Sequence, residues 1–146
     1  MKRWALAVPT VALSLAGCSF PWSAPAPPSP DEVCGALNES LAAAVPPGES
    51  LTELQARGVR LRTPLRFAPG TAPRPSQSSG GVVRGLIAPD GNVVPGSVKT
   101  LKAVGEPQVA GAMEVAALSM SFEFDAAARP TVPIPFTTAL AVCPRS

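Results

Sequence analysis

Hydrophobic positions recur with a helical period in the first part of the chain. Val33, Leu37 and Leu41 stand four residues apart, a spacing that places them on one face of a helix. Ser29, followed by a proline and by Glu32, is a typical helix start, because the serine and the glutamate can form a reciprocal capping box. A Pro-Pro-Gly sequence ends the run. These features predict a helix that begins at residue 30.

A second capping pattern follows, and after it the period changes to two. Ser50 and Glu53 predict a short helix that Gly58 can stop. Apolar residues then alternate with arginines as far as Phe67, which is typical of a half-solvated strand. The arginines are either a site for an anionic ligand or the solvent-exposed face of the strand, and the second interpretation is favoured. They are Arg60, Arg62 and Arg66.

The second half of the chain follows a loop at 68–80 that is rich in Pro, Gly and Ser. Its patterns predict two strands joined by a hairpin turn, a helix with one apolar face, and a closing strand. The paired strands are expected at 82–88 and 93–104, the second with an interruption at 95–96, and the turn between them at 89–92. The helix is expected from Pro107 onward and the last strand at 131–142. The expected fold class is α+β, a small antiparallel sheet with one packed helix, preceded by an N-terminal helical segment.

The first residues match the pattern of a bacterial export signal. Lys2 and Arg3 precede an uncharged run of about a dozen residues, whereas crossing a bilayer needs roughly 20. The sequence Leu15-Ala16-Gly17-Cys18 then resembles the lipobox of bacterial lipoproteins, which implies cleavage before Cys18 and a lipid on its thiol. An ordinary secreted protein is the alternative. We expect a signal peptide at 1–17 and a Pro/Ala/Ser-rich tether at 18–29.

Charge and composition argue against several functions. The chain has 12 Lys and Arg against 10 Asp and Glu, and cleavage removes two basic residues and no acidic one, so the mature chain is neutral. A neutral chain without a basic cluster is not expected to bind nucleic acid. The chain has no histidine, and its carboxylates in the second half stand singly. We therefore expect that the protein is not an enzyme and that it has neither a cofactor nor a metal site.

Two cysteines remain if Cys18 carries lipid. Cys34 and Cys143 are expected to form one disulfide, because export would place both thiols in an oxidising compartment. Two unpaired, buried thiols are the alternative.

An ordered series of short motifs runs through the second half. They are Gly81-Val82-Val83, Ile87 ahead of Asp90-Gly91, Val93, then Val109, Ala112-Met113 and Ala116-Ala117, and finally Phe122 and Val132-Pro133-Ile134-Pro135-Phe136. In this order they resemble the C-terminal domain of TonB-type energy transducers, with Met120 in place of the family's Trp and Phe124-Asp125 in place of Pro-Ala. The resemblance implies a β-β-α-β domain at 81–143, behind N-terminal helices and a strand at 30–67.

The family's domain binds a short peptide of an outer-membrane transporter by strand addition. The resemblance therefore implies a lipid-anchored binding domain, accessory to TonB-dependent transmembrane transport. A structural or assembly lipoprotein that uses the fold as a scaffold or for homodimerisation is the alternative. The expected partners are a membrane, through the lipid, and a transporter peptide or another envelope protein. In sorting of the enteric type, an Asp directly after the lipidated cysteine retains a lipoprotein in the inner membrane. This chain has Ser19 at that place, so the resemblance implies that the protein is located on the periplasmic side of the outer membrane.

Two prolines in the closing strand predict which side of it faces outward. Pro133 and Pro135 share parity and lack the amide donor, so their side should form the edge of the sheet. A visiting peptide is then expected to pair beyond the prolines, where every residue has an N–H. This stretch comprises Thr137, Thr138, Ala139, Leu140, Ala141 and Val142. Protection against edge-to-edge aggregation is the alternative role of the prolines.

Overall fold

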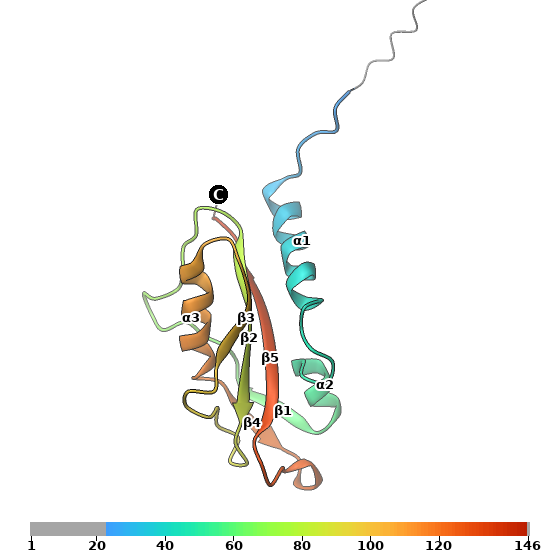
Figure 1. The fold of residues 1–146 in the computed structure, drawn as a ribbon, viewed down its shortest axis with the longest axis vertical. Helices are drawn as coiled ribbons and strands as arrows, with labels where there is room; N and C mark the ends of the chain where they lie inside the picture. The colour runs from blue at the N-terminus through green and yellow to red at the C-terminus, as the bar shows by residue number, and fades with distance from the viewer. Residues whose placement is uncertain (1–22, 146) are drawn as a thin grey trace, which may run out of the picture.

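A computed structural model of the protein describes residues 23–145, so the predicted signal peptide and Cys18 lie outside the described residues. The chain forms an α+β fold, as expected (Figure 1). The helices are α1 (Pro30–Ala42), α2 (Leu51–Ala56) and α3 (Pro107–Ala117), with a 3-10 turn, η1, at Ala126–Ala128. The strands are β1 (Val59–Thr63), β2 (Ser79–Ile87), β3 (Lys99–Val104), β4 (Ser121–Phe124) and β5 (Ile134–Val142).

The strands form two small antiparallel sheets. In the larger sheet the order is β3-β2-β5, so β5 is an edge strand, and in the smaller one β1 pairs with β4. Strand β4 was not predicted. Because β1 pairs with β4, the segment before the 68–80 loop and the segment after it contribute to the same fold.

Several predicted boundaries were wrong. Strand β1 ends at Thr63 rather than Phe67, because its partner β4 is only four residues long. The predicted interruption of the return strand at 95–96 is confirmed as a turn at 94–97, but the strand resumes only at Lys99 and leaves an isolated bridge at Val93. The closing strand begins at Ile134, which leaves Pro133 outside it.

The predicted start of α3 at Pro107 and both predicted capping boxes are confirmed. Ser29 and Ser50 each accept a hydrogen bond from the amide three residues on, and Glu32 and Glu53 bind back to the respective serine amides. Gly58 follows α2 with a φ of 85°, the left-handed conformation that favours glycine at a helix end.

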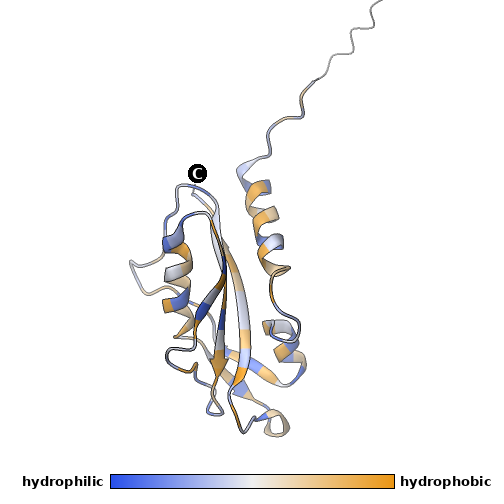
Figure 2. Ribbon diagram, viewed as in Figure 1, coloured by the Kyte–Doolittle hydropathy of each residue, from blue (hydrophilic) through white to orange (hydrophobic). Residues whose placement is uncertain are grey.

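Helices α1 and α3 cover opposite faces of the larger sheet (Figure 1). Gly80 of β2 permits the close packing of α1, because a Cβ at this position would lie 2.6 Å from Leu41 of that helix. A Cβ on the adjacent Gly81 would point to the other face, at an ordinary contact distance of 3.4 Å from the sulfur of Met113 in α3. Helix α1 carries alternating hydrophobic and hydrophilic bands (Figure 2). Its Leu41 is completely buried.

The main hydrophobic core is formed by residues of α3, α2 and both sheets. Phe136 of β5 is completely buried there and packs against Phe122 of β4 with ring centroids 5.2 Å apart. The other members of the core are Leu54, Val59, Val83, Ile87, Val93, Met113, Ala117 and Met120. Burial of such side chains is the main favourable term in the folding of a domain of this size.

The predicted disulfide is confirmed. Cys34 of α1 is bonded to Cys143, the residue after β5, with Cα atoms 6.1 Å apart. It fastens α1 to the C-terminal end of the sheet. Within residues 23–145 no helix is long and apolar enough to span a bilayer.

Candidate functional site

The outer side of strand β5 is the region where the sequence predicts partner binding. Thr137 donates its amide hydrogen to the carbonyl of Glu49, at 2.8 Å, and so points away from the paired strand β2. In an antiparallel strand, alternate residues point their N–H and C=O groups to the same side. Ala139 and Ala141 therefore also present these groups to the outer side.

The prediction of the binding stretch needs one correction. The backbone groups of Thr138, Leu140 and Val142 face β2, with which β5 pairs along its whole length, so these residues offer nothing to a visitor on the outer side. Pro135 has the parity of Thr137 and therefore lies with its missing donor outward, as predicted. The candidate edge, as we define it, consists of Thr137, Ala139 and Ala141.

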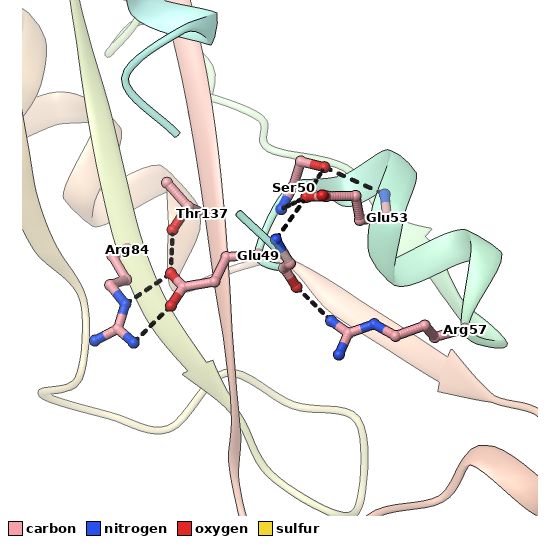
Figure 3. A network of polar contacts seen from close by, with 7 residues as sticks. Glu49, Ser50, Glu53, Arg57, Arg84 and Thr137 are labelled. Atoms are coloured by element: carbon pink, nitrogen blue, oxygen red, sulfur yellow. Dashed lines mark hydrogen bonds and ion pairs between the residues drawn. The ribbon is translucent and has the colours of Figure 1, made fainter. Parts of the chain in front are cut away.

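The first residue of the candidate edge already has a partner. The carboxylate of Glu49 accepts two hydrogen bonds from the Arg84 guanidinium, each 2.7 Å long, and one of 2.7 Å from the Thr137 hydroxyl (Figure 3). Together with the bond to the Thr137 amide, these contacts hold the segment between α1 and α2 against β5. We call this segment, residues 43–50, the α1–α2 linker.

The α1–α2 linker is also tied to helix α2 (Figure 3). The Glu53 carboxylate accepts hydrogen bonds from the amides of Gly48, at 2.9 Å, and Ser50, at 3.3 Å. Arg57, at the end of the helix, donates to the carbonyl of Gly48. The backbone around Glu49 is therefore fixed from both sides.

Ionisation of Glu49 is favoured by this environment. The hydrogen bonds from Arg84 lower the pKa of the Glu49 carboxyl below its ordinary value of 4.5, and the bond from the Thr137 hydroxyl acts in the same direction, although burial opposes both. The Glu49 side chain is 13% exposed and that of Arg84 43%, so water screens the arginine end of the ion pair.

Replacement of Glu49 with Gln should reduce stability in a pH-dependent way. At pH 7 the free energy of unfolding should fall by about 1 kcal/mol, which is the contribution of a charge-assisted hydrogen bond after solvent screening has weakened it. Because the folded pKa is lowered, this stabilisation is fully present above pH 4.5 and is lost as pH falls through the folded value. Denaturant unfolding from pH 7 to 3 should therefore show the two proteins converge. Glu39→Gln, on the exposed face of α1, is the control and should cost less than about 0.5 kcal/mol at every pH.

The other edge of the larger sheet is protected. In β3 the amide and hydroxyl of Thr100 both donate to the Glu114 carboxylate of α3, at 2.8 and 2.6 Å. The pairing of β3 with β2 also shifts at Leu101, and such a bulge distorts an edge. Lysines at 99 and 102 add charge, another feature that discourages strand pairing.

The arginines predicted on the first strand are brought together only in part. Arg60 and Arg62 line one cavity of about 290 Å³, which Arg66 does not reach and whose other charged groups are Asp90, Glu123 and Arg129. Arg60 pairs with Asp125 at 3.0 Å and Arg62 is 3.7 Å from Glu123, with all four side chains more than half exposed. Arg66 lies apart from them, beside an apolar cavity of about 410 Å³ between residues 66–71 and α3. This arrangement fits the solvent-exposed face rather than an anion site.

A larger cavity, of about 590 Å³, lies between residues 67–76 and residues 142–145. Its charged groups are Arg74 and Arg145, both exposed to solvent. None of the residues that hold Glu49 lines it.

Nothing in residues 23–145 gathers three or more His, Cys, Asp or Glu side chains in a group that could hold a metal ion. The polar arrangement that holds the α1–α2 linker against β5 consists of Glu49, Arg84 and Thr137. The sequence analysis named Thr137 as a binding residue but missed Glu49 and Arg84. Comparisons of the chain with protein-family models, curated proteins and solved structures found no match.

Proposed function

We propose that the protein is a lipid-anchored envelope protein that binds an extended segment of another envelope protein on the candidate edge. The observation that carries this proposal is the position of β5 at the margin of the sheet, with Ala139 and Ala141 directed outward. A strand that pairs there gains main-chain hydrogen bonds, the source of affinity in strand addition.

The contrast between the two edges supports the choice of β5. On β3, the amide of Thr100 is bound to a side chain. On the outer side of β5, only the amide of Thr137 is hydrogen-bonded within residues 23–145, so those of Ala139 and Ala141 remain available. A protein that merely avoided edge pairing would be expected to protect both edges. The partner we propose is the periplasmic segment of a TonB-dependent outer-membrane transporter.

The proposed location follows from the lipobox-like motif and the disulfide. A bond between Cys34 and Cys143 is typical of proteins that mature in an oxidising compartment. We place the protein on the periplasmic side of a membrane, with the outer membrane favoured by Ser19.

Replacement of Ala139 with Pro should abolish capture of the partner and leave the fold intact. The substitution removes an outward donor but none that pairs with β2, and Pro135 already occupies an equivalent place in the same strand. The measurement is a pull-down of solubilised envelope proteins by the lipidated protein, with the captured proteins identified by mass spectrometry. We expect at least about a tenfold loss of transporter relative to the unsubstituted protein, as for loss of a central ladder bond.

Leu101→Ser, on the opposite edge strand, is the control and should capture as much transporter as the unsubstituted protein, since Leu101 is exposed and remote from β5. Equal capture by the Ala139→Pro protein would contradict the proposal. Capture of an envelope protein that is not a transporter would favour the scaffold alternative instead.

A further inference from the structure

The candidate edge is occupied at one end by the protein's own chain. The carbonyl of Glu49 accepts the outward amide of Thr137, and Ser50 forms an isolated β-bridge with the same residue. A short piece of the α1–α2 linker thus makes the contact that a visiting strand would make.

The side chain of Glu49 makes this contact selective. Its two carboxylate oxygens receive separate donors of one guanidinium, and one of them also receives a hydroxyl. This bidentate geometry matches a carboxylate, because a neutral amide offers one acceptor oxygen and brings unwanted donors. Arg84 and Thr137 stand opposite each other in the register of β2 and β5, so the sheet itself sets the spacing of these donors.

From these contacts we infer that Glu49 is an internal occupant of the partner site, and that the partner presents an extended segment with an acidic residue. This residue displaces Glu49 and takes over the donors of Arg84 and Thr137. The inference rests on the proposed function and specifies the chemistry of the ligand.

The internal occupant also sets a threshold for binding. Helix α1 is held to the sheet by the disulfide and by buried Leu41, and α2 is anchored by Leu54 in the core, so the linker between them remains close to β5. A segment held by so short a tether competes at an effective concentration of roughly millimolar. Weak peptides are therefore excluded from the Thr137 end while Glu49 is in place.

Glu49→Ala in the lipidated protein, purified in detergent, tests the inference. The probe is a synthetic peptide with the sequence of residues 44–52, compared with the same peptide carrying Gln in place of its Glu. The Glu49→Ala variant should bind the Glu peptide at least about tenfold more tightly than the unsubstituted protein does, because the internal competitor is gone. The same variant should prefer the Glu peptide to the Gln peptide by at least about tenfold. NMR shift changes should centre on the amide of Thr137.

Glu39→Gln is the matched control, because it neutralises an exposed carboxylate of α1 that lies outside the α1–α2 linker. Its affinity for the Glu peptide should equal that of the unsubstituted protein. A second variant, with Arg84→Met added to Glu49→Ala, should lose the preference for Glu over Gln, and its amide spectrum reports whether the fold persists.

Equal affinity of the Glu49→Ala variant for both peptides would overturn the inference, as would equal affinity of the variant and the unsubstituted protein for the Glu peptide. A transporter segment that pairs at Ala139 and Ala141 while the bond between Thr137 and Glu49 persists would also overturn it, and would leave the proposed function standing. Selectivity for the Glu peptide that depends on Arg84, without capture of any transporter, would support the acidic ligand at this site and contradict the transporter as the partner.

Discussion

Replacement of both Cys34 and Cys143 with Ser is expected to lower the free energy of unfolding by about 4–5 kcal/mol. The two cysteines are 109 residues apart, and closing a loop of this length removes much of the conformational entropy of the unfolded chain. A small domain whose total stability is about 5–15 kcal/mol would lose a large part of it. Denaturant titration of the two proteins, monitored by far-ultraviolet circular dichroism, measures the difference.

Ser40→Ala is a suitable control, because it changes an exposed residue of α1 whose hydroxyl accepts a single hydrogen bond of 3.3 Å, from Lys102, among the described residues. It should cost less than about 0.5 kcal/mol. Loss of less than about 1 kcal/mol in the double-serine protein would contradict the entropic argument. It would mean that α1 is held by packing of residues such as Leu41 alone.

The substitution Cys18→Ala should have an all-or-none effect on maturation. The thiol of Cys18 is the proposed acceptor of the lipid, and alanine has no nucleophilic atom to replace it. The protein should accumulate as an uncut precursor without acyl mass, as judged by intact mass spectrometry of the membrane fraction. In the unsubstituted protein, residues 1–17 should be missing and acyl mass added.

The double substitution of Cys34 and Cys143 serves as a control here as well, and its processing should be unchanged. Release of the Cys18→Ala protein in a correctly cut, soluble form would contradict lipidation. An unmodified Cys18 in the mature, unsubstituted protein would favour the ordinary secreted alternative.

Local features of the fold were predictable from the sequence. The capping boxes at Ser29 and Ser50 depend only on residues three apart, so the starts of α1 and α2 follow from local chemistry. The hairpin turn at Asp90-Gly91 and the outward position of Pro135 are similarly local.

Features that depend on distant partners were not predictable. The end of β1 is set by β4, about 60 residues away, whose four residues Ser-Phe-Glu-Phe are too few for their alternation to distinguish a strand from a loop. Glu49 stands alone after a Pro-Pro-Gly sequence and gave no signal. Its role depends on Arg84 and Thr137, which only the pairing of β2 with β5 brings together. The one available hint was a charged residue, Arg84, within the otherwise apolar β2.

Strand addition at β5 is tested most directly by backbone hydrogen exchange, measured at single-residue resolution. The lipidated protein would be examined in detergent with and without the N-terminal periplasmic segment of a TonB-dependent transporter from the same host. Strand addition at β5 should give new protection at the amides of Ala139 and Ala141, with Thr138 and Leu140 unchanged because their amides already pair with β2. Protection confined to the arginine face of β1, at Arg60 and Arg62, or to the amides of β3, would contradict it.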